Sequence, residues 1–256
     1  MKRRKNVGRK YVFFDVDGTL VSHVGESHIP HETVEAILRL REKGHVPAIA
    51  TARSLCLTRK VASSLGMELL VCCNGAHVLY KDRILEERYL PSSFVEAMKH
   101  AAFERHFDIS LLDAEHVYTG QDSPDFAAYL REQAGFDCRS PLACASRAFL
   151  AYNFSKTSFH TEDAEGVEFF PSPHYVEARL HGVSKWSGIL KSAAALGFEI
   201  QDIVAVGDGA NDVDMIEKAS IGIAIKGSVA ERSASYVAED IDRGGIFDIL
   251  KKLDMI

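Results

Sequence analysis

The first eighty residues alternate short apolar runs with stretches in which apolar residues recur at helical spacing. The runs YVFFDVD, HVPAIAT and LLVCCNGA carry aromatic and β-branched residues, which predicts buried strands. The stretches PHETVEAILRLREKG and SLCLTRKVASSLG predict helices that each stop at a glycine. Because strands that alternate with helices form parallel β-α-β units, this pattern indicates an α/β fold with a doubly wound parallel sheet.

The regular alternation stops after about residue 80 and returns after about residue 182. Between these points YKDRILEERYLP predicts a hairpin or short strands, SSFVEAMKHAAFERHF predicts a helix, and RAFLAYNF and HYVEARL alternate in polarity. Helices are then predicted for SKWSGILKSAAALG, NDVDMIEKA and GGIFDILKKL, with strands at DIVAVGD and SIGIAI. We therefore expect a core from residues 1–80 and 183–256, interrupted by a mixed α/β module from residues 81–182.

Composition narrows the class of protein. The chain has 256 residues, 46% hydrophobic and 26% charged, which is typical of a soluble folded protein. Its net charge of −6 argues against a general nucleic-acid binder, and no segment fits a signal peptide or a membrane span, so a cytoplasmic location is expected. The five cysteines are scattered without a Cys-x-x-Cys pair and predict reduced thiols rather than disulfides or a zinc site. The basic start, MKRRKNVGRK, is expected to be a solvated tail.

Two aspartates stand where the first apolar run ends. Residues two apart on a strand project to the same side, so Asp15 and Asp17 leave the carboxyl end of this strand together. Ligands bind at that end of open parallel sheets. Two close carboxylates repel each other unless a cation or a shared proton relieves them, and oxygen ligands suit Mg²⁺. Gly18 allows a sharp turn there, and Thr19 offers a hydroxyl and an amide to an anion.

An EF-hand calcium loop is a competing interpretation of the same residues. Asp15 and Asp17 are followed by Glu26 at the twelfth position of such a loop. The sixth position, which requires glycine, is Leu20, and the preceding run predicts a strand rather than a helix. The sequence therefore excludes a calcium loop, while a turn that merely favours aspartate and glycine remains an alternative for DVDG taken alone.

A second acidic strand end argues against that alternative. In VAVGDGANDVDMI, Asp208, Asn211 and Asp212 again follow an apolar run. Two such ends in a parallel-sheet pattern would place four carboxylates near one edge, and such a cluster calls for a metal and a cationic partner. Thr51 adds a hydroxyl at the end of the second predicted strand. Lys185 begins a predicted helix, where it could neutralise carboxylates and phosphate.

Together these segments closely resemble the haloacid dehalogenase superfamily of phosphohydrolases. DVDGT is similar to its first motif, Thr51 to its second, Lys185 to its third and GDGAND to its fourth, and the resemblance spans nearly the whole chain. The NGA at residues 74–76 and the form GDGANDVDMI resemble the Cof-like subgroup, subfamily IIB. The resemblance implies a Rossmann-like catalytic core in residues 1–80 and 183–256, with an inserted α/β cap domain in residues 81–182 that selects the substrate.

Three departures from the family pattern stand out. Ala52 lies where the second motif often has glycine, and Trp186 lies where the third motif often has glycine. Both changes leave the implied chemistry intact. The stretch SKTSFHTEDAEG is polar and short where related caps often carry a full helix, so the shape of the cap, and with it the substrate, is left open.

The resemblance implies a Mg²⁺-dependent phosphatase that hydrolyses small phosphomonoesters, such as sugar phosphates or related metabolites. Asp15 would be the nucleophile that forms an aspartyl-phosphate, and Asp17 would protonate the leaving oxygen and then deprotonate water. Mg²⁺ would bridge Asp15, the Asp17 carbonyl and Asp208 to the phosphate, with Asp212 as a ligand or a partner of the ligands. The residues implied to hold or orient the phosphate are Thr51, Lys185 and Asn211.

Two other functions fit the same motifs. A phosphomannomutase-like phosphotransferase would need a cap built for two phosphates, and the GDGAND form favours the phosphatase over it. A non-catalytic sensor of a phosphorylated ligand would be expected to have lost at least one residue of the set Asp15, Asp17, Lys185 and Asp208. The sequence identifies neither the substrate nor the oligomeric state.

For several other residues, a structural interpretation competes with a functional one. Three histidines in one polar loop could bind a transition metal, although a solvated loop is more typical of their mixed spacing: His23, His28 and His31. Trp186 could stack on a substrate ring, but packing is expected, and Cys72 and Cys73 are expected to be structural thiols. Arg53 either serves the phosphate site or pairs with a carboxylate.

Overall fold

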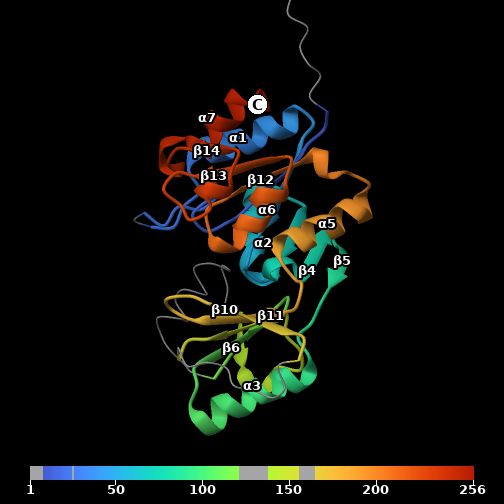
Figure 1. Cartoon of the computed structure of the whole chain (residues 1–256), viewed down its shortest axis with the longest axis vertical. Helices are drawn as coiled ribbons and strands as arrows, with labels where there is room; N and C mark the ends of the chain where they lie inside the picture. The colour runs from blue at the N-terminus through green and yellow to red at the C-terminus, as the bar shows by residue number, and fades with distance from the viewer. Residues whose placement is uncertain (1–7, 25, 121–137, 156–164) are drawn as a thin grey trace, which may run out of the picture.

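The computed structural model describes residues 8–24, 26–120, 138–155 and 165–256, and within them it has two sheets (Figure 1). The larger sheet has eight strands in the order β14-β13-β12-β1-β2-β3-β4-β5. Its strands are β1 (Tyr11–Phe14), β2 (Val46–Ala50), β3 (Leu69–Cys72), β4 (His77–Tyr80), β5 (Arg83–Glu87), β12 (Ile203–Gly207), β13 (Ile221–Ile225) and β14 (Tyr236–Ala238).

Neighbouring strands are parallel from β14 through β3, and β4 and β5 extend the sheet as an antiparallel hairpin. Successive residues of β1 bury their side chains on opposite faces: Val12 and Phe14 lie in one apolar cluster and Phe13 in the other. A strand covered on both faces needs an unbroken apolar run, which explains the sequence YVFF. The predicted doubly wound α/β fold is confirmed.

Five helices cover this sheet within the described residues. Their spans are α1 (His31–Glu42), α2 (Leu55–Leu65), α5 (Lys185–Leu196), α6 (Val213–Lys218) and α7 (Gly245–Lys252). The apolar residues of α1, α2 and α7 share the cluster of Val12 and Phe14, whereas those of α5 and α6 share the cluster of Phe13. The sheet is therefore packed between two helical layers, which is the arrangement that the helical spacing in the sequence predicts. Among the described residues, no helix has both the length and the apolar character that crossing a bilayer requires.

The smaller sheet has six strands in the order β10-β11-β9-β6-β7-β8, and we call it, together with helix α3 (Ser92–Arg105), the cap. Helix α3 packs on one face of this sheet, and the other face is turned toward the core (Figure 1). The strands are β6 (Ile109–Leu112), β7 (Val117–Thr119), β8 (Arg139–Pro141), β9 (Leu150–Asn153), β10 (Val167–Pro171) and β11 (Val176–Leu180).

The expected boundary at residue 81 falls inside the hairpin of β4 and β5. Since β5 pairs with β4 in the larger sheet, the division between the two sheets lies after Glu87. On the return side, β11 ends at Leu180 and α5 begins at Lys185, close to the expected residue 183. Most of the polar stretch SKTSFHTEDAEG, residues 156–164, lies outside the described residues, as does the start of the basic tail, residues 1–7.

A tight turn after β3 fits against the start of α5. Cys73, Asn74 and Gly75 all have positive φ, at 50°, 51° and 97°. A Cβ on Gly75 would lie 2.0 Å from the backbone oxygen of Ser184, and a Cβ on Gly188 would lie 2.8 Å from the Cα of Gly75. Only glycine permits this approach, so the turn locks the first turn of α5 in place.

We predict that Gly75→Ala destabilises the protein more than Gly227→Ala. Both glycines have positive φ, but a Cβ on Gly227 meets nothing within 4 Å. The left-handed backbone alone costs about 1–2 kcal/mol, and the added overpacking at Gly75 costs about 1–3 kcal/mol more. Urea unfolding of the two variants measures the difference. Equal losses of stability would contradict the close packing of this turn on α5.

Candidate active site

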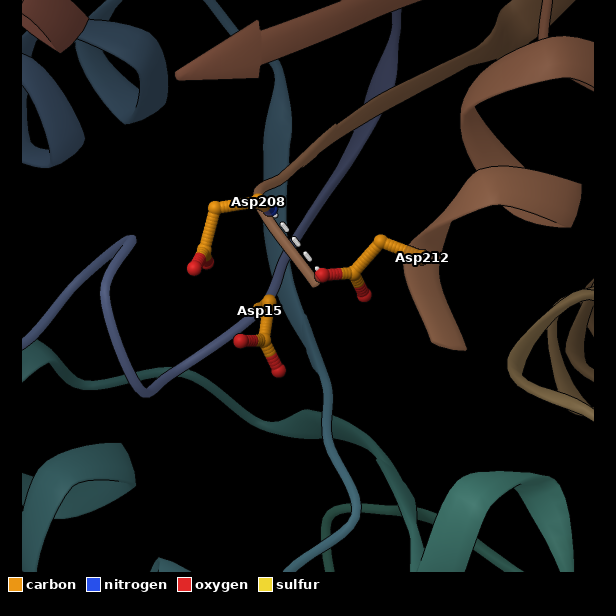
Figure 2. A group of neighbouring side chains, drawn as sticks. All are labelled: Asp15, Asp208 and Asp212. Carbon is orange, nitrogen blue, oxygen red and sulfur yellow. Dashed lines mark hydrogen bonds between the residues drawn. The ribbon is translucent and has the colours of Figure 1, made fainter. Parts of the chain in front are cut away.

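Three aspartates meet at the carboxyl ends of β1 and β12. These strands are parallel neighbours, so the residues that follow them, Asp15 and Asp208, emerge at the same edge of the sheet. One carboxylate oxygen from each of Asp15, Asp208 and Asp212 lies within 4.8 Å of the other two, and Figure 2 shows the three side chains as neighbours. The structure thus brings together the two acidic strand ends that the sequence predicts.

Asp212 holds the loop that carries Asp208. Its Oδ2 accepts hydrogen bonds from the backbone amides of Asp208 at 3.0 Å, the dashed line in Figure 2, and of Gly209 at 2.8 Å. The loop folds so tightly around this carboxylate that a Cβ on Gly207 would lie 2.5 Å from the Asp212 Cγ. The fully buried Asp212 therefore positions the loop through its Oδ2.

Lys185 lies beneath the aspartates and is fully buried. Its Nζ donates to Asp15 Oδ1 at 2.5 Å and to Asp212 Oδ1 at 2.6 Å. It is the first residue of α5, whose N-cap Ser184 accepts a hydrogen bond from the Ser187 amide. Burial acts to lower the pKa of Lys185, but Asp15 and Asp212 outweigh it and raise the pKa, so the lysine is a permanent cation.

One lysine does not neutralise three carboxylates. Burial, opposed by Lys185 and reinforced by Asp212, raises the pKa of Asp15 to about 8. Burial also raises the pKa of Asp208 to about 6. In the described structure no hydrogen bond reaches Asp15 Oδ2 or Asp208 Oδ2, whereas both Asp212 oxygens are engaged. Hard divalent cations prefer carboxylate oxygens as ligands. A cation of this kind between Asp15 and Asp208 would bind these two oxygens and supply the positive charge that the cluster lacks.

The turn after β1 is shaped around Asp208. The Thr19 hydroxyl donates to Asp208 Oδ1 at 2.8 Å. Gly18 has φ of +80°, and a Cβ there would lie 2.5 Å from Asp208 Oδ2. The glycine of DVDGT is therefore required both by its backbone conformation and by the space that the Asp208 carboxylate takes.

The Asp17 side chain is held by Arg53 and His23 rather than by Lys185. The Arg53 guanidinium binds it through two nitrogens, with Nε 2.8 Å from Asp17 Oδ2, and His23 Nε2 lies 2.9 Å from Asp17 Oδ1. Burial acts to raise the pKa of Asp17, but hydrogen bonds from Arg53 and His23 together lower it. Arg53 thus pairs with a carboxylate beside the site. The side chain of Asp17 is outside the aspartate trio, and its expected metal ligand is the backbone carbonyl.

A chain of hydrogen bonds joins the cap to the loop of Asp208. Asn211 Nδ2 donates to Asn74 Oδ1 at 3.0 Å, and Asn74 Nδ2 donates to the two carboxylate oxygens of Glu177 at 2.8 and 3.1 Å. Glu177 is buried on β11 of the cap, and Arg179 Nη1 lies 3.7 Å from its Oε1. Burial raises the pKa of Glu177. Sequence analysis missed this role of Glu177, although an acidic residue in the alternating strand VEARL is a signal for a buried partner.

A cavity of about 670 Å³ lies between the core and the cap above these groups. Its core side includes Asp15, Asp17, Thr51, Arg53 and Asn211, so the two residues expected to contact phosphate beside Lys185 reach this space. Thr51 is almost fully buried, and its hydroxyl accepts from the Arg53 amide at 3.2 Å. The cavity can hold a small ligand with one end at the aspartates.

The other candidate residues add no second metal site among the described residues. The three loop histidines do not form a site: His23 contacts Asp17, His28 Nε2 lies 3.3 Å from Asp242, and His31 is exposed at the start of α1. Among the described residues, the aspartate trio is the one group of acidic, histidine or cysteine side chains that could hold a metal. Core packing accounts for the remaining three: Trp186, Cys72 and Cys73.

We predict that Lys185→Met destabilises the protein by about 3–5 kcal/mol at neutral pH, because it leaves buried carboxylates without a counter-charge. The loss should shrink as the pH falls, since Asp15, whose pKa is raised to about 8, then takes up a proton and depends less on the lysine. Lys191→Met is the matched control on α5: Lys191 is exposed and its Nζ lies 3.1 Å from Glu86, so it should cost less than about 1 kcal/mol. Denaturant unfolding at several pH values gives the comparison, and equal losses for the two variants would contradict it.

Comparisons with known proteins agree with this site and fold. A family model described as haloacid dehalogenase-like hydrolase matches residues 12–250. YkrA of Bacillus subtilis (strain 168) is 27% identical, and the match covers 96% of this chain and 98% of YkrA. The 5-amino-6-(5-phospho-D-ribitylamino)uracil phosphatase YcsE of the same organism is 23% identical, with 95% of each chain covered.

A solved structure gives the same result for the fold. BT4131, described as a sugar phosphatase of haloacid dehalogenase subclass IIB, has a TM-score of 0.80 at 23% identity, covering 96% of this chain and 100% of that chain. The resemblance that the four motifs predict is confirmed. The chain belongs to the haloacid dehalogenase-like hydrolase family.

Proposed function

We propose that this protein is a Mg²⁺-dependent phosphatase that hydrolyses small phosphomonoesters through an aspartyl-phosphate. The observation that carries the proposal is the buried cluster of Asp15, Lys185, Asp208 and Asp212 at the floor of a cavity. Membership of a hydrolase family and a relative named as a phosphatase support it. Bound Mg²⁺ would be held by Asp15, Asp208 and the Asp17 carbonyl and would neutralise charge on the phosphoryl oxygens.

Asp15 is the proposed nucleophile. Its Oδ2, the oxygen not bonded to Lys185, attacks phosphorus while the bond from phosphorus to the leaving oxygen breaks. Lys185 holds Asp15 in one orientation and compensates negative charge as the phosphoryl group arrives. Thr51 and Asn211 line the cavity and are positioned to donate hydrogen bonds to phosphoryl oxygens.

Asp17 is the proposed general acid and base. Arg53 and His23 favour its ionised form, which is the form that takes a proton from the water that attacks the aspartyl-phosphate. In the first step Asp17 must instead carry a proton to the leaving oxygen, and His23 Nε2, which lies 2.9 Å from Asp17 Oδ1, is within proton-transfer distance. Attack of water then breaks the acyl-phosphate bond, releases inorganic phosphate and restores Asp15.

The cap is the proposed substrate-selecting domain. Its described residues contribute none of the groups at the aspartate cluster but form the opposite wall of the cavity. Glu177 connects it to the loop of Asp208 and Asn211 through Asn74, so the fit of the cap over the cavity is coupled to the geometry of that loop. A closed cap would also exclude bulk water from the aspartyl-phosphate.

We expect chelation with EDTA to abolish phosphate release and Mg²⁺ to restore it, while Ca²⁺ does not. Ca²⁺ takes more ligands at longer distances, which would spoil the in-line arrangement of Asp15 and the phosphoryl group. Phosphate release from a panel of phosphomonoesters measures this. Undiminished hydrolysis in EDTA would refute the metal-dependent mechanism.

We expect Asp15→Asn to form no phosphoenzyme and to lose hydrolysis entirely. Asp17→Asn keeps the nucleophile, so with an activated aryl ester, whose leaving group needs little protonation, it should still form some phosphoenzyme but hydrolyse it about 10²–10⁴-fold more slowly. Acid quenching after mixing with a ³²P-labelled ester detects the intermediate. Substantial turnover by both variants would show that neither residue has its proposed role.

A further inference from the structure

The cavity has two walls of different chemistry. The core wall is polar and contains the aspartates, so the phosphoryl group of a substrate lies there and the leaving group faces the cap. The cap wall is largely apolar and, among the described residues, contains no lysine, arginine or carboxylate side chain. Its members are Ser110, Leu112, Val117, Tyr152, Phe154, His174 and Tyr175.

Strand pairing explains why these side chains share one wall. Ser110 on β6 is directly opposite Tyr152 on β9, and Leu112 on β6 is directly opposite Val117 on β7, so each pair projects from the same face. The residues between them, including Leu111, point to the other face and pack against α3. The strand residues of the cavity wall therefore share one face of the cap sheet, and the loop residues Phe154, His174 and Tyr175 extend it.

Three aromatic rings of this wall contact one another. Tyr175 meets Tyr152 edge to face, with ring centroids 5.1 Å apart and planes at 86°, and meets Phe154 at 5.9 Å and 66°. Desolvation and the nearby Glu177 carboxylate raise the pKa of the Tyr152 phenol, so it stays protonated beside that carboxylate. The wall therefore presents aromatic surfaces at different angles, which suits stacked or edge-on contact with a further ring.

The same wall suits a polyol poorly. Every sugar hydroxyl that is buried without a hydrogen-bond partner weakens binding, and the described cap wall provides polar side-chain groups at Ser110, at His174 and at the tyrosine hydroxyls alone. Ser110 is 2% exposed, and its hydroxyl has no hydrogen-bond partner in the described structure. This hydroxyl is placed to bond one polar atom on a substrate that fills the cavity.

We propose that the cap selects phosphomonoesters whose leaving group carries a flat aromatic or heteroaromatic ring, held by Tyr152, Phe154 and Tyr175, with Ser110 bonding a polar atom at the ring edge. This inference rests on the proposed phosphatase function. The cavity of about 670 Å³ accommodates a phosphoryl group together with such a ring.

The first test compares three esters of primary alcohols, benzyl phosphate, cyclohexylmethyl phosphate and glucose 6-phosphate, in the presence of Mg²⁺. The leaving groups are chemically similar at the reacting oxygen and differ in the ring. We expect kcat/KM to fall in that order, with benzyl phosphate favoured over glucose 6-phosphate by about tenfold or more. Hydrolysis of glucose 6-phosphate as fast as benzyl phosphate would overturn this inference and leave the phosphatase proposal standing. No hydrolysis of any ester by the wild-type protein would refute both.

The second test removes one ring. Tyr175→Leu and, separately, Phe154→Leu should lower kcat/KM for benzyl phosphate by about threefold to tenfold and change that for cyclohexylmethyl phosphate less than twofold, because leucine keeps the apolar contact but not the ring. Tyr236→Leu, at an exposed tyrosine of β14 outside the cavity, is the matched control and should alter neither. Circular dichroism verifies folding. An equal fall for both esters would show that the rings supply only apolar surface.

The third test concerns Ser110. Ser110→Ala should lower kcat/KM for the best of the three pyridylmethyl phosphate isomers, whose ring nitrogen can accept the hydroxyl proton, and leave benzyl phosphate unchanged within about twofold. The ratio of the two substrates therefore separates a hydrogen bond to the ring edge from a general packing role. A ratio that Ser110→Ala does not change would exclude the proposed bond.

Discussion

The buried ammonium of Lys185 between Asp15 and Asp212 is the interaction on which the site depends. Each of these charges would be costly in the interior alone, and each is tolerated because the others lie within hydrogen-bond distance. The cluster joins three segments that are far apart in the chain: the end of β1, the start of α5 and the loop after β12. Its geometry in turn requires the glycine turn at Gly75, which seats α5, and the glycine at Gly18, which leaves room for Asp208.

Charge balance links this cluster to its chemistry. A protein interior that holds three carboxylates and one lysine is short of positive charge, and burial together with the neighbouring carboxylates raises the pKa of both Asp15 and Asp208. Under the proposed function, a cation would supply the missing charge and the phosphoryl group would bring oxygens to share it. The excess of negative charge that destabilises the cluster is therefore also what favours the binding of a cation.

Local patterns in the sequence were sufficient to predict the core and the site floor. The apolar run before Asp15, the run before Asp208 and the helix that begins at Lys185 each lie in one short segment, and parallel pairing brings their ends together. The pairing of Arg53 with Asp17 and the bonds from Glu177 to Asn74 were beyond such reasoning, because the partners come from separate elements whose approach is set by tertiary packing. The expected boundary at residue 81 falls inside the β4–β5 hairpin for a related reason: a hairpin has the same local pattern whether it begins a new sheet or extends an existing one.

The two faces of the cap sheet have different roles. Side chains on one face hold the cap together against α3, and those on the other form the cavity wall. Neighbouring positions of one strand, such as Leu111 and Leu112, therefore have different surroundings: Leu111 packs with α3, whereas Leu112 lines the cavity and also packs in the main apolar cluster. Under the proposed function, substitutions on the cavity face would change which leaving group fits while the face that packs on α3 stays the same. Substrate preference and the internal packing of the cap would then depend largely on different side chains of the same strands.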